Sequence, residues 1–216
     1  MSESLEKTQL SKVKRGAKRA LYDKATAFDI IDSALMCHIA QTQNGQAFVI
    51  PTCHWREGDY LYWHAHSQAR NIRGVIGEPE KICINISLLD GLVMARSAFH
   101  HSVNYRSVTL FGVPELIEDK AEKIRHFELF MDKVSPGRWQ ELRPVNDAEV
   151  KATGLARIKI EEASIKMRAE PPKDDPEDYN WPVWAGVIPL QRSWGEAETD
   201  PLQSESYITP NTPSAF

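Results

Sequence analysis

The feature that most constrains the fold of this chain is its series of short apolar stretches joined by tight-turn dipeptides. Asn44-Gly45, Gly58-Asp59 and Asp90-Gly91 each separate two stretches rich in β-branched, aromatic or alternating apolar residues. Asn-Gly and Asp-Gly are strong hairpin signals because these residues accept the positive φ angles of tight hairpin turns. Few helical stretches lie between the expected strands. The pattern predicts a mainly β protein, a closed or partly closed antiparallel β-barrel with flanking helices.

Alternation and β-propensity set the bounds of the expected strands. We expect strands over residues 35–42, 46–55, 60–64, 81–88, 92–99, 105–117 and 155–167. Pro51 lies inside the second of these and cannot donate to a neighbouring strand, so it requires a sheet edge or a bulge there.

Helical spacing and capping residues predict four helices. The first follows Asp23 or Thr26, the third covers residues 119–133, and a short one follows Asn146. The second is expected over residues 67–76, with Ser67 as N-cap.

Composition bounds the class of protein. The chain has 216 residues and a formal net charge of −4. Its basic residues are dispersed, which argues against a nucleic-acid surface. The sequence shows neither a membrane-length apolar run nor the apolar core of a signal peptide. Cys37, Cys53 and Cys83 form no C-x-x-C pair, so free thiols in a reducing cytoplasm are expected.

The chain divides into three parts by composition. We expect a flexible N-terminal arm over residues 1–18, because Lys12 to Arg19 is rich in basic residues. One folded domain follows over residues 19–190. Residues 191–216 are polar, rich in Pro, Ser and Thr and without periodicity, so a disordered tail is expected.

The run from Arg96 to Gly112 is unusually polar for a strand region. It contains two adjacent histidines, hydroxyls, an amide, a tyrosine and arginines. Charged and amide groups in a strand are costly without partners, so an anionic or heteroaromatic ligand would fit. Exposed polar residues on an edge strand would give the same pattern.

A second candidate site lies where a strand runs into a helix. Ser67, Arg70 and Arg73 lie at or near the start of that helix. Free backbone N–H groups at a helix N-terminus and an arginine fork suit a phosphate monoester. Two arginines spaced like this also occur on solvated helix faces.

Histidine pairs raise the question of a metal site. His64 and His66 share one face of an expected strand, and His100 and His101 would be able to complete a ligand set. No carboxylate or cysteine stands at ligand spacing nearby, so no metal site is expected. Walker, dinucleotide and nucleophile-elbow motifs are absent from the sequence.

The long run from Leu88 to Val108, LLDGLVMARSAFHHSVNYRSV, resembles the signature of flavin-nucleotide-binding proteins related to pyridoxamine phosphate oxidase. The branch it resembles most contains nitroimidazole-resistance proteins. Supporting segments lie over residues 19–23, 49–52, 136–139 and 182–187. The resemblance covers residues 15 to 190 in the same order.

The resemblance implies a split β-barrel homodimer with one FMN in each of two clefts between subunits. It places Arg70, with Ser67 and Arg73, at the phosphate, although Ala69 stands where the family has a serine. Other cofactor contacts are implied along three strands and near the end of the domain, at Ile50, Pro51, Thr52, Trp63, His64, Asn104, Tyr105, Arg106 and Trp184.

The leading functional hypothesis is an FMN-dependent oxidoreductase that reduces nitro, quinone or oxygen species. The proton donor would be His64 or His101, since imidazole exchanges protons at neutral pH. Two alternatives stay open: a non-catalytic flavin-binding or flavin-sensing protein, and a haem or metal protein on the same barrel. Genuine pyridoxamine phosphate oxidase activity is disfavoured, because the C-terminal arginine–histidine element of that enzyme has no counterpart in residues 184–190.

Overall fold

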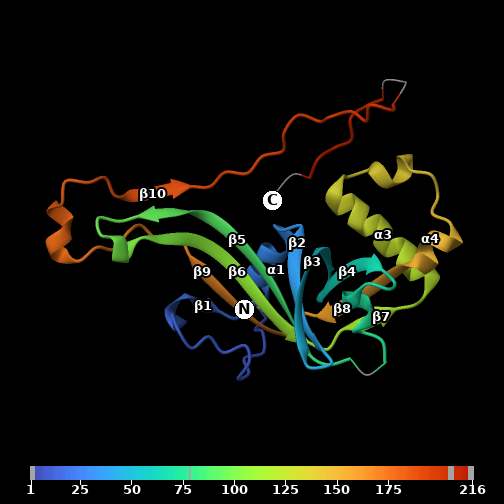
Figure 1. Ribbon diagram of the computed structural model, residues 1–216, viewed down its shortest axis with the longest axis horizontal. Coiled ribbons are helices and arrows are strands. Elements are labelled where there is room, and N and C mark those ends of the chain that lie inside the picture. Colours follow the sequence, from blue (N-terminus) through green and yellow to red (C-terminus); the bar gives the residue numbers. More distant parts are fainter. Residues whose placement is uncertain (1–2, 78, 204–206, 214–216) are drawn as a thin grey trace.

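One large antiparallel sheet forms the framework of the protein (Figure 1). The computed structural model describes residues 3–77, 79–203 and 207–213. Nine strands follow one another across the sheet, and β10 (Gly186–Pro189) pairs with β5 beside that path. The order is β1 (Ala20–Leu21), β9 (Glu162–Arg168), β6 (Ser102–Gly112), β5 (Ile82–Met94), β2 (Met36–Gln43), β3 (Gln46–Glu57), β4 (Tyr60–His66), β8 (Thr153–Lys159) and β7 (Glu115–Ile117).

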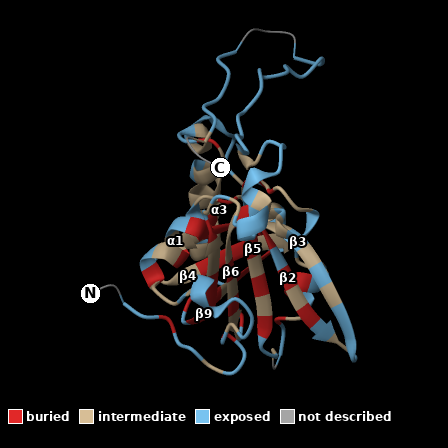
Figure 2. Cartoon of the chain, turned by 90° about the vertical axis from the view of Figure 1, so that its left-hand side faces the viewer, coloured by how far each residue is buried: buried red, intermediate tan, exposed pale blue. Residues whose placement is uncertain are grey.

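The sheet wraps around a large apolar core without closing, and Trp55, Tyr62, Ile117 and Leu155 form a second, smaller buried cluster. The two edges of the sheet are β1 and β7, and the consecutive strands β8 and β9 pair with β4 and β6 rather than with each other. Side chains from both halves meet in the larger cluster, including Ile39, Leu61, Leu110 and Ile165. Buried and exposed residues alternate along the strands, as Figure 2 shows for β2 and β5. This confirms the predicted mainly β, split-barrel fold.

Pro51 lies at a sheet edge, as its missing N–H requires. It pairs with His38 of β2, whereas the pairing of β3 with β4 begins only at His54. The other side of β3 at Pro51 therefore has no partner strand among the described residues, and the proline interrupts no ladder.

The expected hairpin at Asp90-Gly91 is wrong. A single strand, β5, runs through both residues and pairs with β6, with a register shift between Leu89 and Gly91. A Cβ atom at residue 91 would lie 2.7 Å from the carbonyl oxygen of Ile188 in β10. Gly91 is thus required by the close approach of β10 and not by a turn. The β5–β6 pair and β10 extend away from the rest of the molecule as a long arm (Figure 1).

Three of the four expected helices begin with a side-chain cap. The side chain of Asp23 accepts from the backbone N–H of Thr26 at the start of α1 (Lys24–Asp32). Asp119 does the same for Glu122 in α3 (Lys120–Val134), and Asn146 forms a capping box with Glu149 in α4 (Asp147–Ala152). These interactions satisfy backbone donors that a helix start leaves free.

The expected helix over residues 67–76 is much shorter. Only α2 (Arg70–Arg73) is helical, its N-cap is Ala69, and no side chain caps it. Ser67 instead donates its backbone N–H to the carbonyl of Ala152. Four short 3-10 helices complete the structure: η1 (Ala17–Arg19), η2 (Ala98–His100), η3 (Arg138–Glu141) and η4 (Pro176–Asn180).

Both terminal segments make contacts with the domain. Leu5 is buried in the core, and the Thr8 hydroxyl donates to the carboxylate of Glu162. Near the C-terminus, the carbonyl of Asn211 accepts from the Ser135 hydroxyl at 2.7 Å. The described residues of 191–213 contain no helix or strand. Among the described residues, no helix is both long and apolar enough to span a membrane.

Candidate functional site

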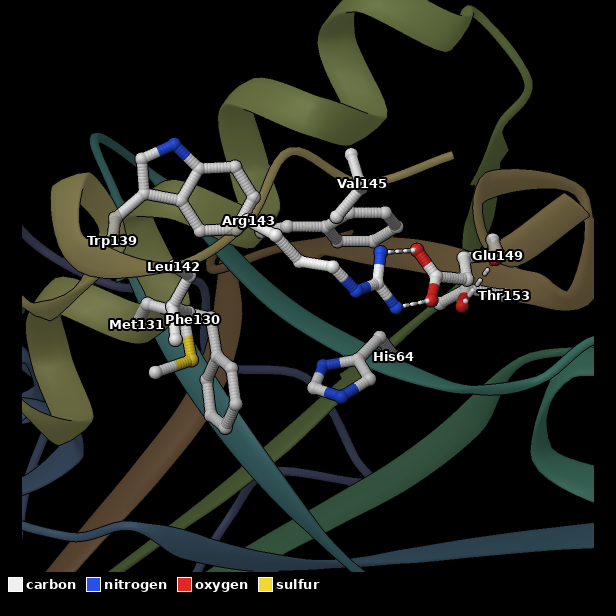
Figure 3. A pocket seen from close by; sticks show the side chains of 10 residues that line it. His64, Phe130, Met131, Trp139, Leu142, Arg143, Val145, Glu149 and Thr153 are labelled. Carbon is white, nitrogen blue, oxygen red and sulfur yellow. Dashed lines mark hydrogen bonds and ion pairs between the residues drawn. The ribbon is translucent and has the colours of Figure 1, made fainter. Parts of the chain in front are cut away.

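An apolar cleft lies between β4 and the helices α3, η3 and α4. It has a volume of about 410 Å³, within the range of cofactor and ligand pockets. Its walls are mainly aromatic and aliphatic, and its polar groups are few. The lining residues are His64, Phe127, Phe130, Met131, Trp139, Leu142, Arg143, Val145, Glu149 and Thr153 (Figure 3).

His64 supplies the one imidazole in this lining. It projects from β4 beside Phe130, whose ring centroid lies 4.7 Å away in an edge arrangement (Figure 3). The buried Nδ1 atom of His64 has no hydrogen-bond partner among the described residues. Burial lowers the pKa of His64 below its ordinary value, so the ring is neutral near neutral pH. A neutral, unpaired imidazole in an apolar cleft is suited to ligate a metal centre.

An ion pair forms the polar rim of the cleft. Both guanidinium nitrogens of Arg143 donate to the Glu149 carboxylate, and the Thr153 hydroxyl donates to the Glu149 carbonyl (Figure 3). Arg143 and the backbone N–H of Asn146 hold the pKa of Glu149 at about 2. The rim therefore carries one fixed cation and one fixed anion at neutral pH.

Local sequence explains how these side chains converge. Phe127, Phe130 and Met131 are spaced three and four residues apart, which places them on one face of α3. Gly137, at φ 81°, turns the chain into η3 and brings Trp139 over the cleft. The capping box of α4 fixes Glu149 at the rim.

The predicted phosphate residues lie elsewhere, on the outside of the sheet. Arg70 is exposed and its guanidinium carbon lies 4.3 Å from the ring centroid of Phe48. Its carbonyl accepts from the side-chain amides of Gln41 and Gln43. Arg73 is exposed and Ser67 half-buried. Since α2 has a single turn, the arginines supply the positive charge here and the helix start adds little.

Of the predicted residues on β3 and β4, most are accessible. Ile50 and Thr52 are half-buried and Pro51 is exposed. The Thr52 hydroxyl lies 3.5 Å from the carbonyl oxygen of His64. Trp63 differs, because its side chain is fully buried in the core and its indole donates to the Asn71 carbonyl. The structure thus places Trp63 away from any ligand-accessible surface.

The polar residues of β6 already have protein partners. Asn104 is buried, and its side-chain oxygen accepts from Arg168 and from the backbone N–H of Glu170. Arg106 donates to both carboxylate oxygens of Asp90. Tyr105, which lies between these two residues in the sequence, is half-buried. Hydrogen bonds and ion pairs within the protein therefore account for part of the unusual polarity of residues 96–112.

The histidine pairs do not form one site. His66 is exposed near the end of β4, whereas His100 and His101 lie at η2, at the tip of the arm (Figure 1). The Nδ1 atom of His101 lies 2.8 Å from the carbonyl oxygen of Ser97. The β5–β6 arm separates the two pairs, so the ligand set of four histidines that the sequence raised is not assembled within the described chain.

Two further residue groups lie on the arm. Trp184 is 63% exposed and its ring packs beside Gly186. Donor atoms of His100, Asp174 and Asp178 lie within 4.8 Å of one another, but Asp174 is already paired with Arg96.

The sequence interpretation found His64 but missed the rest of the cleft. Phe127, Phe130 and Met131 read as an ordinary core face of a helix, and Trp139 and Arg143 lie in a stretch without clear periodicity. The sequence signals here were the helical spacing of residues 119–133 and the family resemblance over residues 136–139, and neither places these side chains beside His64.

Comparisons with known proteins agree with this fold. The pyridoxamine 5'-phosphate oxidase family model matches residues 23–167. None of the curated proteins compared matches the chain. The solved structure of the flavocytochrome Anf3 from Azotobacter vinelandii is similar, with 44% identity, a TM-score of 0.88 and 94% of each chain covered.

Two further solved structures are similar. The FAD and heme binding protein from Mycobacterium smegmatis has 29% identity and a TM-score of 0.83, with 89% of this chain and 94% of that chain covered. A putative 5-nitroimidazole antibiotic resistance protein from Bacteroides thetaiotaomicron shares the fold at 23% identity and a TM-score of 0.56, over 68% of this chain and 85% of that chain. By its family match and its fold, the chain belongs to the pyridoxamine 5'-phosphate oxidase family.

Proposed function

We propose that this protein is a redox protein that binds both a flavin and a haem. The observation that carries the proposal is the apolar cleft with an unpaired, neutral imidazole, His64, in its wall. The similarity to a flavocytochrome and to a protein that binds FAD and heme supports it.

The cleft residues fit a haem. His64 has a ring nitrogen without a partner, and a histidine is the usual protein ligand of haem iron. Phe127, Phe130 and Trp139 supply aromatic walls for a flat apolar ring system. Arg143 at the rim would pair with a haem carboxylate. When bound, the haem would supply one-electron chemistry that protein side chains cannot perform on their own.

The flavin would bind on the outer face of the sheet. Arg70 and Arg73 provide exposed positive charge for its phosphate, and Phe48 beneath Arg70 provides an aromatic surface. Ile50, Pro51 and Thr52 would lie along the ring. We propose FMN as the flavin, following the family resemblance; an FAD would use the same phosphate contacts.

We further propose a homodimer with the flavin between subunits. Large apolar side chains are exposed on the outer sheet face and on the arm, including Val49 at 65%, Met36 at 52% and Leu92 at 45%. Such exposure marks an interaction surface in a soluble protein. A second copy would cover these residues and enclose the flavin.

Flavin-dependent reduction of nitro or quinone acceptors is the second candidate reaction. His64 is then the candidate proton donor at the cleft. Because burial lowers the pKa of His64, a small fraction of the ring carries a proton to donate at neutral pH. This favours the ligand role of His64 over the proton-donor role. A flavin-binding or flavin-sensing protein without turnover is the non-catalytic alternative.

Reconstitution with haem and with FMN or FAD tests the proposal. The purified protein, desalted after addition of each cofactor, should retain a Soret band and a flavin spectrum. His64→Ala should lose the Soret band while retaining flavin. His66→Ala is the matched control, because His66 lies two residues further along β4 and is exposed; it should retain both cofactors. Retention of an unchanged Soret band by His64→Ala would overturn the haem site.

A further inference from the structure

A buried tryptophan lies directly behind the His64 cleft. Trp55 of β3 is 1% exposed. Its ring centroid lies 5.7 Å from that of His64 and 5.3 Å from that of Phe130, and both of these side chains line the cleft. Trp55 is thus separated from the cleft by no more than one side chain.

The indole of Trp55 has an unusual hydrogen-bond partner. Its Nε1–H donates to Nδ1 of His126, 3.2 Å away, and His126 is fully buried on α3. An indole N–H can only donate, so Nδ1 of His126 is the acceptor in this hydrogen bond. His126 can therefore accept the indole proton of Trp55 when the indole loses an electron.

The other ring nitrogen of His126 faces charged groups of both signs. The Nη2 atom of Arg125, which is paired with Glu57, lies 3.0 Å from Nε2 of His126. Carboxylate oxygens of Glu57 and Glu122 lie 3.7 Å and 3.9 Å from the same nitrogen. Burial, together with Arg125, keeps the pKa of His126 low and its ring neutral, while the two carboxylates favour an imidazolium once a proton arrives.

Aromatic rings continue from Trp55 to the surface. Tyr62 stacks on Trp55 with centroids 6.0 Å apart and on His126 at 4.0 Å. Tyr60 follows at 6.3 Å from Tyr62, and the guanidinium of Arg157 lies over its ring. Trp and Tyr are the side chains that most readily lose one electron, so this row connects the cleft with the outside of β4.

We propose that Trp55 is a redox-active residue that donates one electron to an oxidised cofactor in the His64 cleft while its indole proton moves to His126. The proposal rests on the proposed haem in that cleft. The oxidant is a peroxide: reduction of hydrogen peroxide to two waters takes two electrons, one from Trp55 and one from the bound cofactor, and two protons, which come from solvent. Two equivalents of an external one-electron donor then restore the cofactor and the indole, and the indole regains the proton held by His126.

Other nearby indoles lack this arrangement. Trp63 donates to the backbone carbonyl of Asn71, which has no capacity to hold a proton. Trp139 lines the cleft, but its indole N–H makes no hydrogen bond within the part of the chain that the structure describes. Trp63, which is buried but does not line the cleft, is therefore the matched control for Trp55.

The experiment is freeze-quench electron paramagnetic resonance of the haem-loaded protein after mixing with equimolar hydrogen peroxide. The signal is measured per bound haem, which the Soret band counts. The wild-type protein should show an organic radical whose spectrum narrows when the tryptophans carry deuterated rings. Trp63→Phe should keep the radical, Trp55→Phe should lose it, and Trp55→Tyr should restore a radical with a tyrosine line shape. His126→Gln should shorten its lifetime, because the proton acceptor is gone.

The outcomes separate this proposal from the proposed function. If the protein takes up no haem, both the proposed function and the redox role of Trp55 are overturned. A protein that binds haem and keeps an unchanged tryptophan radical in Trp55→Phe retains the proposed function, and the role of Trp55 is overturned. If Trp55→Phe does not fold, ring deuteration of the wild-type protein decides: a spectrum that does not respond to it excludes an indole radical.

Discussion

Arg143 and Glu149 face each other across the mouth of the His64 cleft, with two nitrogen–oxygen contacts between them. Glu149 also closes the capping box of α4, so one carboxylate both fixes a helix start and holds Arg143 in the cleft lining. This arrangement ties the position of Arg143 to the folding of α4.

Substitution of Arg143 should change how the free energy of unfolding depends on pH. Arg143, more than the Asn146 backbone, holds the pKa of Glu149 at about 2, well below the ordinary value of about 4.3. A depressed carboxyl pKa stabilises the fold above the unfolded pKa, and that contribution is lost as pH falls toward 2. Arg143→Gln should therefore melt below the wild type near pH 6, and the difference should vanish near pH 2.

Thermal melts across this pH range, with an NMR titration of Glu149, provide the measurement. Arg138→Gln is the control, since Arg138 pairs with Glu141 on η3 and not with Glu149. A Glu149 titration curve that is the same in Arg143→Gln and in the wild type would show that the ion pair does not hold the carboxylate in solution.

The strand order was not predictable from the sequence, although the strand content largely was. Local patterns such as the alternation from Ile82 to Leu88 predict which face of a strand is buried, and the structure has the same alternation in β5. Asp90-Gly91 was wrongly predicted as a hairpin turn, because the same dipeptide also occurs where a strand lies close to another backbone. Here that backbone is β10, about a hundred residues later in the chain. Long-range contacts of this kind leave no local signature.

The residues of the candidate site were also only partly predictable from the sequence. His64 was identifiable as a histidine that follows strand aromatics, but its burial against Phe130 depends on α3, more than sixty residues away in the chain. Asn104 and Arg106 lie in the unusually polar run and were expected as cofactor contacts from the family resemblance, and the structure supplies each with a protein partner. Polarity shows that a residue needs a partner; it does not show whether the partner is protein or ligand.

Arg70 should matter for flavin retention. It is exposed, held in place through its carbonyl by Gln41 and Gln43, and its guanidinium is stacked on Phe48. Arg70→Ala should weaken FMN binding by about 1.5–3 kcal/mol, the usual contribution of a hydrogen bond to a charged group. Fluorescence titration of FMN provides the measurement, with Arg138→Ala, on η3, as the control. An FMN affinity equal to that of the wild type would remove Arg70 from the phosphate site.

Gly91 should tolerate no side chain while β10 remains paired. A Cβ atom at residue 91 would lie 2.7 Å from the Ile188 carbonyl oxygen, and backbone atoms move less easily than the end of a side chain. Gly91→Ala should lower the free energy of unfolding by about 1–3 kcal/mol, as overpacking does elsewhere. Gly195→Ala is the control, because its added Cβ would meet no atom within 4 Å. Urea unfolding compares the two; equal stabilities would mean that β10 does not pair with β5 in solution.

Lys133 should destabilise the protein at neutral pH. Its ammonium group donates to the Ala34 carbonyl at 2.8 Å, beside a small cavity lined by Trp55, Arg56 and Leu129. Burial, more than any neighbouring charge, lowers the pKa of Lys133 to about 8 from an ordinary value of 10.5. Between these two values the unfolded chain holds a proton that the folded chain has released, so stability rises with pH through this window.

Lys133→Met should therefore stabilise the protein below pH 8, by on the order of 2–3 kcal/mol, less the hydrogen bond to Ala34. The gain should disappear above pH 10.5, where the lysine is neutral in both states. Urea unfolding at about pH 7 and about pH 11 measures it, and Lys120→Met is the control, because Lys120 is exposed at the start of the same helix. A gain of equal size at both pH values would mean that added apolar burial, and not the removal of a desolvated charge, stabilises the variant.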